Sequence, residues 1–422
     1  MSEKKKILVL SDHPMAPSGV AHQTRVFIES LITTGKYKFI CLGGAVKHHN
    51  YEIQTITDER WDDGDWIVQP VDGYGSQEMI RSVVWAEKPD LIWFMTDPRY
   101  FEWLWQIENE IRSVVPMVYY HVWDNYPLPL FNKKWYDSTD VIASISKVTH
   151  DIVNKVSPDV KNYYLPHAVN SDIFKKLDQK HIDEFKDTQF PNHDDRFVFF
   201  WNNRNARRKQ SGTIIHWFNK FAEEVGPENV CLIMHTDPQD PNGQDLNAIL
   251  SDFQMDDGRI MISKKNVPPE ALSLMYNMAD CTINISDAEG FGLSTLESLS
   301  CGTPIIVNMT GGLQEQVTDG KNWFGVGIEP AAKSMIGSQN VPYIYEDRVS
   351  ESDFINALHK IYSMSDKDRE NMINLGTKHV HENYNFDVLK NKWIEIIEKT
   401  IEDLGSWETR KGYKAWSLKE IA

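Results

Sequence analysis

The stretch DAEGFGLSTLESLSCGTPIIVNMTGGLQEQV, residues 287–317, decides the fold that we expect for this chain. It follows the apolar run CTINI at 281–285, which is typical of a buried parallel strand. The glycines at 290 and 292 interrupt that pattern, and a helix is expected after them. The run TPIIV at 303–307 then predicts a second strand, which ends at the glycine pair 311–312. A strand, a glycine turn and a helix, repeated once, predict an α/β domain with a parallel sheet.

Both glycine turns lie between the carboxyl end of a strand and the amino end of a helix. Unpaired N–H groups and the helix dipole attract anions such as phosphate at that place. Glu289 lies in the first turn, and Glu297 follows eight residues later, about 10 Å away along a helix axis. This separation favours two roles along one extended ligand over a catalytic pair. Spacing alone leaves open an exposed helix position for Glu297 and a helix-start carboxylate for Glu289.

The segment EGFGLSTLE resembles the E-x7-E signature of family 4 retaining glycosyltransferases, and SCGTPIIVNMTGGLQEQV is similar to the segment that follows it in that family. The resemblance implies that Glu289 contacts the sugar of a nucleoside diphosphate sugar and that Glu297 contacts the ribose. It also implies that backbone N–H groups of Phe291, Gly292 and Leu293 hold the sugar and the phosphate.

The same resemblance implies an α/β fold of GT-B architecture. Two Rossmann-like domains would face a central cleft, and C-terminal helices would cross back to the N-terminal domain. We expect an acceptor domain at 1–170, a nucleotide-sugar donor domain at 171–385 and the returning helices at 386–422. A length of 422 residues suits two domains, and 41% apolar with 25% charged residues is a globular composition.

Apolar runs and turn residues predict the other elements. We expect N-terminal strands at 7–10, 37–43, 91–95, 117–120, 140–146 and 163–165, with a helix at 101–114, and C-terminal strands at 197–201, 230–234 and 259–263. Residues 175–195 are polar and are expected to form a surface linker. The glycine- and proline-containing stretch after 317 is expected to be an irregular insert. Two final helices are expected at 351–363 and 386–404.

The segment NNRNARRKQ follows the strand at 197–201. Arg204 leaves this strand and Lys209 begins the next helix, so we expect both cations to converge on one diphosphate. Each charge-assisted hydrogen bond would contribute about 1.5–3 kcal/mol. A solvated basic turn is the alternative, but the five-residue spacing equals that of the phosphate-binding pair in the family that the chain resembles. Arg207 and Arg208 are additional cations without an assigned role.

The N-terminal half offers fewer candidates. The loop SDHPMAPSGV resembles the N-terminal glycine loop of the family, which implies that Ser18 and Gly19 face the cleft; an ordinary strand-to-helix turn is the alternative. His121 ends an apolar run at the place where the family has a histidine that faces the donor sugar. A structural histidine is the alternative, and Asp124 is a weaker candidate.

The loop SKKNV at 263–267 is similar to the one that lies against the nucleotide base, which makes Asn266 and Val267 candidates for donor binding. Acidic clusters such as 62–65 and 256–257 stand beside glycines and are interpreted as surface turns. We therefore expect no metal and no cofactor beyond the nucleoside diphosphate sugar as the donor substrate.

The net charge of −17 weighs against broad binding to DNA or to anionic membranes, although a local basic groove stays possible. Four cysteines lie in or beside apolar segments without metal-type spacing, which favours a reduced, cytoplasmic protein. The apolar run at 7–10 is too short for a signal peptide, and no membrane-spanning segment is expected.

These observations predict the transfer of a sugar from a nucleoside diphosphate sugar to an unidentified acceptor: a glycan, a small molecule or modified DNA. The resemblance to family 4 implies retention and a reaction without a metal. The segments SDHPMAPSGV and RNARRKQ also resemble those of glycosyltransferases of large tailed phages, some of which act on hydroxymethylated bases; the protein would then work in the host cytoplasm. A GT-B phosphorylase, a sugar-nucleotide epimerase and a noncatalytic nucleotide-sugar-binding protein are further alternatives. A phosphorylase would need a pyridoxal-phosphate lysine context, which we do not find in the sequence.

Overall fold

The computed structural model describes residues 3–189, 196–255, 257–264 and 266–415. Its residues form two compact units. Unit 1 comprises Met1–His167, Gln339–Pro342 and Phe386–Ala422, and unit 2 comprises Ala168–Ser338 and Tyr343–Asn385. Each unit is built around its own sheet and is described by itself.

The described part of unit 1 contains an eight-stranded sheet in the order β3-β4-β2-β1-β5-β6-β7-β8. All neighbours are parallel except β3 and β4. The central strands are almost fully buried, as expected for a sheet covered by helices on both faces. The strands are β1 (Lys5–Asp12), β2 (Tyr37–Gly44), β3 (Gln54–Thr55), β4 (Trp66–Pro70), β5 (Leu91–Met95), β6 (Met117–His121), β7 (Val141–Ser144) and β8 (Lys161–Tyr164).

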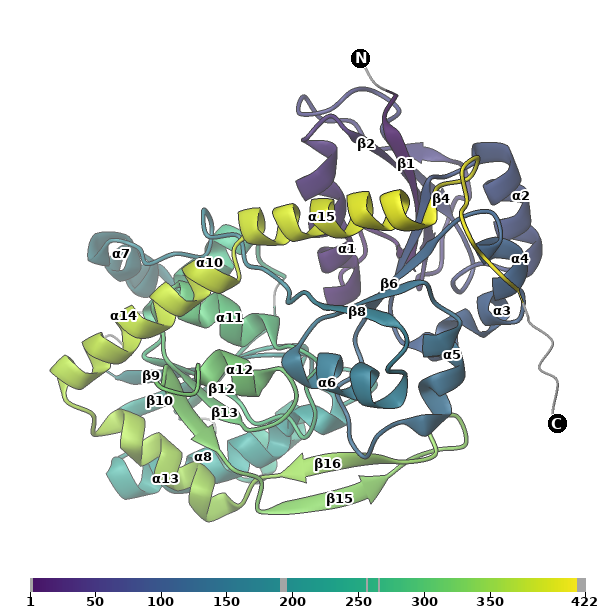
Figure 1. The fold of residues 1–422 in the computed structure, drawn as a ribbon. Coiled ribbons are helices and arrows are strands. Elements are labelled where there is room, and N and C mark those ends of the chain that lie inside the picture. The colour runs from purple at the N-terminus through teal and green to yellow at the C-terminus, as the bar shows by residue number, and fades with distance from the viewer. Residues whose placement is uncertain (1–2, 190–195, 256, 265, 416–422) are drawn as a thin grey trace. The chain divides into compact units, whose positions relative to one another are not determined.

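Short helices connect these strands (Figure 1). They are α1 (Gly19–Ile32), α2 (Gln77–Glu87), η1 (Pro98–Phe101), α3 (Glu102–Trp105), α4 (Glu108–Arg112), η2 (Leu130–Asn132), α5 (Lys133–Asp137) and α6 (Lys147–Val156). The single helix expected at 101–114 is wrong. Phe101 and Ile107 have non-helical backbone angles, which divide this stretch into η1, α3 and α4.

The C-terminal helix α15 (Phe386–Leu404) belongs to unit 1 and packs against α1 (Figure 1). Its Trp393 is fully buried, with its ring centroid 5.0 Å from those of Phe27 and Tyr120 and 6.0 Å from that of Trp93. Beyond the helix, Arg410 donates to the carbonyl of Arg112 at 2.7 Å. The expected return of the last helix to the N-terminal domain is confirmed by this packing.

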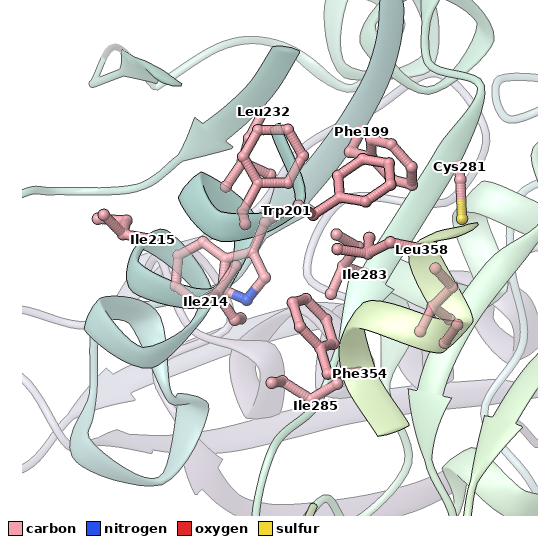
Figure 2. Close-up of a cluster of buried hydrophobic side chains, with 14 of the residues drawn as sticks. Phe199, Trp201, Ile214, Ile215, Leu232, Cys281, Ile283, Ile285, Phe354 and Leu358 are labelled. Atoms are coloured by element: carbon pink, nitrogen blue, oxygen red, sulfur yellow. The ribbon is translucent and has the colours of Figure 1, made fainter. Parts of the chain in front are cut away.

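The described part of unit 2 contains a six-stranded parallel sheet in the order β11-β10-β9-β12-β13-β14. Apolar side chains of β9, β10 and β12 meet those of α8 (Ser211–Val225) and α13 (Glu351–Tyr362) in one buried cluster, which includes Trp201, Ile214, Ile283 and Phe354 (Figure 2). The strands are β9 (Phe197–Asn202), β10 (Val230–His235), β11 (Ile260–Ser263), β12 (Cys281–Asn284), β13 (Ile305–Asn308) and β14 (Gly325–Ile328).

The helices of unit 2 are α7 (Gln179–Gln189), η3 (Arg207–Lys209), α8 (Ser211–Val225), α9 (Leu246–Asp252), α10 (Pro269–Met278), α11 (Leu293–Ser300), α12 (Leu313–Val317), α13 (Glu351–Tyr362) and α14 (Asp366–Asn383). The linker expected at 175–195 is wrong in part, because α7 lies there and packs against α10. Helix α14 was not expected; its mostly polar residues give it a weak apolar face, and only Gly376 and Val380 are buried within its described length.

The insert expected after 317 is irregular only in part. It contains β14 and an antiparallel two-stranded ribbon of β15 (Ala332–Ile336) and β16 (Ile344–Arg348) (Figure 1). The ribbon is held to the rest of unit 2 through its backbone, because Asp347 N donates to Asp287 O at 2.9 Å. Asn308 also donates its Nδ2 to Asp347 O at 2.9 Å. Tertiary contacts of β16 therefore order a segment whose composition favours loops.

No described helix is long and apolar enough to cross a lipid bilayer. The four cysteines, Cys41, Cys231, Cys281 and Cys301, are buried free thiols. A buried free cysteine packs as a small apolar residue.

Candidate functional site

The glycine turn between β12 and α11 is tightly packed at the carboxyl edge of the unit 2 sheet. Gly292 has a φ of +93°, which favours glycine, and a Cβ there would lie 2.6 Å from Leu313 Cδ2. A Cβ at Gly312 would lie 2.7 Å from both Gly290 O and Phe291 Cα. The two glycine turns that the sequence singled out therefore meet, and Gly312 N donates to Glu289 O at 3.0 Å.

Helix α11 begins without a side-chain cap, because its N-cap residue is Gly292. The first amide groups of an α-helix have no partner within the helix and carry the positive end of its dipole. Gln316 fixes the preceding turn by donating its Nε2 to Phe291 O at 2.7 Å. Leu293 is half-buried as the first helical residue. This arrangement suits an anion at the amino end of α11.

Lys209 and Glu289 form a buried ion pair beside this turn. Their side chains are 9% and 11% exposed, respectively. Burial alone would raise the pKa of Glu289, but the charges of Lys209 and Arg208 outweigh this effect and lower the pKa to about 2. Lys209 also donates to Asn203 Oδ1 at 2.9 Å. Glu289 is therefore ionised at neutral pH.

One of the two polar side-chain atoms of Asn203 has a hydrogen-bond partner in the described part of the structure, and the other has none. Its Oδ1 accepts from Lys209, whereas its buried Nδ2 has no hydrogen-bond partner in the described part of the structure. An unsatisfied buried donor is costly, so such a group in a native protein needs an explanation. A ligand oxygen next to Lys209 would supply the missing acceptor.

The turn η3, which carries Lys209, is held by charged contacts with β16 and the turn after β12. Arg207 donates to Glu346, whose side chain is 2% exposed. Arg208 Nη1 lies 3.6 Å from Glu289 Oε2 and donates to the carbonyl of Ala288. The sequence left Arg207 and Arg208 without a role; the structure uses Arg207 to hold the turn and places Arg208 next to Glu289.

Asp287 is the second buried carboxylate of this turn, and sequence analysis missed it. Arg348 Nη1 lies 2.9 Å from Asp287 Oδ2, and Gln210 Nε2 donates to the same oxygen at 2.7 Å. Burial raises the pKa of Asp287 to about 6 despite these partners. Nothing in its sequence context distinguishes it from a solvent-exposed turn aspartate, because its partner Arg348 lies 61 residues away along the chain.

Glu297 lies on α11 and takes part in a second polar group. Tyr276 Oη donates to Glu297 Oε2 at 2.8 Å, and Asn202 Nδ2 donates to Tyr276 Oη at 2.8 Å. Burial raises the pKa of Glu297 to about 7, although the hydrogen bond from Tyr276 acts in the opposite direction. Glu297 is therefore neither a fully solvated helix residue nor a partner of Glu289.

Arg204 and Lys209 have separate partners in this structure, and their convergence on one diphosphate stays a prediction. Arg204 is 64% exposed at its side chain and donates through Nε to Asp240 Oδ2 at 2.6 Å. Lys209 is directed instead to Glu289 and Asn203. The cations that meet at Glu289 are Lys209 and Arg208. The left-handed Gln210 after η3 fixes the direction of this turn, and sequence spacing does not reveal that conformation.

His121, for which a role toward the donor sugar was expected, lies at the end of β6. Its ring is fully buried in unit 1, its Nε2 lies 2.8 Å from Tyr136 Oη, and burial lowers its pKa to about 3. The imidazole is therefore neutral and packed between Tyr119 and Tyr136, with ring centroids 4.8 Å away on both sides. The buried Nδ1 has no hydrogen-bond partner in the described part of the structure, and a role of His121 toward the donor sugar stays a prediction. Asp124 is half-buried in the loop after β6.

Ser18 is the N-cap of α1. Its Oγ accepts from Ala21 N at 3.0 Å and donates to Asp12 Oδ2 at 2.5 Å. Gly19 is exposed, and a Cβ there would meet nothing within 4 Å. Both residues therefore lie at the amino end of a helix that follows a buried strand, and a binding role for them stays a prediction.

Asn266 and Val267 lie between β11 and α10; Asn266 is exposed and Val267 is half-buried. Lys265 of the same loop lies outside the described residues, as does Asp256 of one acidic cluster. Of the other cluster, Asp62 and Asp65 accept from Lys4. The described residues contain no group of three or more His, Cys, Asp or Glu side chains placed to hold a metal ion.

Residues 182–379 match the family model of "Glycosyl transferases group 1". The chain is 39% identical over 87 residues to a D-inositol 3-phosphate glycosyltransferase of Acidothermus cellulolyticus, which covers 20% of this chain and 19% of that protein. It is 23% identical over 188 residues to an N-acetyl-alpha-D-glucosaminyl L-malate synthase of Bacillus anthracis, covering 44% and 45% of the two chains. The matches thus span less than half of these relatives' length.

Solved structures extend the likeness to both units. A sucrose-phosphate synthase from Thermosynechococcus elongatus has a TM-score of 0.73 at 15% identity, covering 95% of this chain and all of that chain. HepE from Anabaena, in complex with UDP and glucose, has a TM-score of 0.67 at 13% identity, with 94% and 100% coverage. At these identities the likeness shows the fold alone. The expected GT-B fold, with two Rossmann-like domains, is confirmed.

Proposed function

We propose that this chain, whose residues 182–379 match the family model of the glycosyl transferases group 1, transfers a sugar from a nucleoside diphosphate sugar to an acceptor hydroxyl. The observation that carries the proposal is the site at the carboxyl edge of the unit 2 sheet. There the buried Lys209–Glu289 pair, the unsatisfied Asn203 amide and the glycine turn before α11 belong to one group of contacts.

Each part of this site has a task in the proposed reaction. The bond between the anomeric carbon and the diphosphate oxygen breaks, so negative charge develops on the diphosphate. Lys209, Arg208 and the first amide groups of α11 stabilise that charge electrostatically. Glu289 accepts hydrogen bonds from sugar hydroxyls, because an ionised carboxylate is an acceptor only. The ion pair with Lys209 keeps Glu289 charged without a ligand.

The bond to the acceptor forms at the same anomeric carbon. We propose that the acceptor oxygen attacks from the face that the diphosphate leaves, so that the configuration is retained. The proton of the acceptor hydroxyl passes to the leaving phosphate oxygen. Retention follows from the resemblance to family 4, as does the expectation that no metal is needed. Buried free thiols support a reducing, cytoplasmic location.

The proposal is tested with the full chain in two steps. A thermal-shift screen of nucleoside diphosphates and their sugars identifies the donor, and the sugar product is then followed by NMR from the first turnovers, with and without EDTA. We expect product of the donor's own anomeric configuration in both reactions. Predominantly inverted product would contradict retention, and loss of turnover in EDTA would contradict a metal-independent reaction.

The alternatives predict other outcomes in the same assays. A noncatalytic binding protein would give a thermal shift but no hydrolysis or transfer of the donor. An epimerase would change the free sugar or the nucleotide sugar without an acceptor. Action on hydroxymethylated DNA, as in the phage enzymes, is an alternative that predicts turnover of the donor with this DNA as the acceptor.

The pH dependence of donor binding tests the role of Glu297. We propose that its carboxylate accepts hydrogen bonds from the ribose diol, so the protonated form binds poorly. Because burial raises its pKa to about 7, the ionised fraction falls from about 0.9 at pH 8 to about 0.1 at pH 6. We expect the Kd of the nucleoside diphosphate, measured by calorimetry, to rise about tenfold over this range.

The Glu297→Gln variant is the control for this pH dependence. It should bind more weakly than the parent at pH 8 and should lose most of the change between pH 6 and pH 8. Because the phosphates of the ligand also titrate near pH 6, the comparison between variant and parent isolates the contribution of Glu297. An unchanged pH profile in the variant would place the ribose elsewhere.

A further inference from the structure

A group of aromatic and acidic side chains at the carboxyl ends of β1, β2, β4 and β5 in unit 1 has no task in the reaction described above. We call it the tyrosine–aspartate patch. It consists of Asp12, His48, Tyr51, Asp72, Tyr74 and Tyr100. Tyr51 and Tyr100 are 51% and 53% exposed. Ligands of open α/β sheets bind beyond the carboxyl ends of the strands, so the patch lies where a ligand of unit 1 is expected.

The turn that carries Tyr74 is rigidly attached to the sheet. Ala45 N donates to Gly73 O at 2.8 Å. A Cβ at Gly44 would lie 2.1 Å from Gly73 O, so this approach requires glycine at the end of β2. Gly73 and Gly75 have φ values of +58° and +107° and allow the sharp turn on either side of Tyr74. The ring of Tyr74 is thus placed by the backbone.

The aromatic rings of the patch support one another. The ring centroids of Tyr74 and Tyr100 are 5.0 Å apart at an interplanar angle of 34°, and Tyr74 also meets Phe101 at 5.6 Å. The rings of His48 and Tyr51 are 5.5 Å apart. Rigid, half-exposed aromatic rings provide apolar faces with polar edges, which match a ligand that has both C–H faces and hydroxyl groups.

Carboxylates line the same patch. Tyr74 Oη donates to Asp12 Oδ1 at 2.8 Å, and Tyr51 Oη donates to Asp72 Oδ1 at 2.5 Å. Each carboxylate oxygen has two lone pairs, so the exposed Asp72 can accept further hydrogen bonds. Asp12 is 7% exposed, and its Oδ2 already accepts from Ser18 Oγ. Donors that fit here are hydroxyl groups, whereas an anion would meet negative charge.

The four loops that form this edge contain few cations. Residues 13–18, 45–53, 71–76 and 96–101 include Lys47 and Arg99 as their only lysine and arginine. Arg99 makes two 2.8 Å hydrogen bonds to Asp97. Phosphate groups and nucleic acids are normally bound by clusters of lysine and arginine, which this edge lacks in sequence.

We propose that the tyrosine–aspartate patch binds the acceptor and that this acceptor is a neutral, polyhydroxylated molecule, a sugar or the end of a glycan, rather than a phosphate ester or DNA. The inference rests on the proposed function and adds the chemical class of the acceptor. The names of two proteins matched above refer to a phosphorylated inositol or a phosphorylated sugar. The patch indicates a neutral acceptor for this chain instead.

The test compares neutral acceptors with their phosphorylated counterparts. With the donor found in the thermal-shift screen, release of nucleoside diphosphate is measured for glucose and glucose 6-phosphate, inositol and inositol 3-phosphate, a series of oligosaccharides, and duplex DNA with hydroxymethylcytosine. We expect neutral saccharides to give kcat/KM values at least about tenfold above those of the phosphate esters and the DNA. Preference for a phosphate ester or the DNA, or no response to any neutral saccharide, would overturn the inference.

Variants of the patch locate the binding site. Tyr100→Ala is expected to raise the KM for the best neutral acceptor about tenfold and to leave the Kd of the nucleoside diphosphate unchanged. Trp85→Ala removes a 61%-exposed aromatic residue on α2, outside the patch, and should leave both values unchanged. An unchanged acceptor KM in Tyr100→Ala would place the acceptor elsewhere. Binding of the donor and its slow hydrolysis without an acceptor test the proposed function. A failure of the acceptor inference is therefore distinguishable from a failure of the proposed function.

Discussion

Replacing Lys209 with methionine is expected to lower kcat about 10²–10³-fold, the loss typical of removing one preorganised group that stabilises transition-state charge. Methionine keeps the unbranched apolar stem but removes the ammonium group that lies between Glu289 and Asn203. Glu289 would then be buried next to Arg208 alone, with Nη1 of Arg208 3.6 Å away. Initial rates with the donor and the best acceptor, at saturating concentrations of both, measure the effect.

Two further variants separate catalysis from folding. Lys220→Met removes a lysine of α8 that pairs with Glu351 at 2.7 Å, outside the site, and should keep kcat within about twofold. The double variant Lys209→Met/Glu289→Gln removes both buried charges, so it should recover thermal stability without recovering activity. A Lys209→Met protein with near-parental kcat would refute the proposed stabilisation of the leaving group.

Trp393→Ala is expected to lower the free energy of unfolding of unit 1 by about 3–5 kcal/mol. The indole is fully buried and contacts Phe27, Trp93 and Tyr120, so truncation leaves a large cavity between α15 and the rest of the unit. Urea unfolding followed by tryptophan fluorescence and by far-UV circular dichroism measures the change.

Trp85→Ala serves again as the comparison, because this tryptophan of unit 1 is mostly exposed. We expect it to cost less than about 1 kcal/mol. Because the chain has two units, fluorescence and circular dichroism can report two separate unfolding transitions. The change in the free energy of unfolding is measured on the transition whose urea midpoint Trp393→Ala shifts. A loss below about 1 kcal/mol would show that α15 contributes little to the stability of unit 1.

Much of the donor half of the site was predictable from local sequence. Glu289 and Glu297 were expected to have separate tasks, and the structure gives them separate partners, Lys209 and Tyr276. The glycines at 292 and 312 were expected to mark strand-to-helix turns, and both lie where only glycine fits without displacing neighbours. Such features are local, because a strand, a tight turn and a helix follow one another within about 30 residues.

Three features of the structure depend on residues that lie far away along the chain, outside any local window. Arg204 pairs with Asp240, which lies 36 residues away along the chain. The second cation at Glu289, beside Lys209, is Arg208. His121 ends a strand as expected, but Tyr119 and Tyr136 enclose its ring. The polar stretch at 175–195 contains α7, because packing against α10 stabilises a helix that its own composition does not favour.

The amino-acid sequence by itself determined the α/β class, most strand positions and the glycine turns, because these depend on the order of apolar and turn-forming residues along a short segment. Only the tertiary structure decided which charges are partners. The pairs Lys209–Glu289, Arg207–Glu346 and Asp287–Arg348 join residues 61 to 139 positions apart. Their energies depend on burial and distance, and neither quantity exists until the sheet and its loops have assembled.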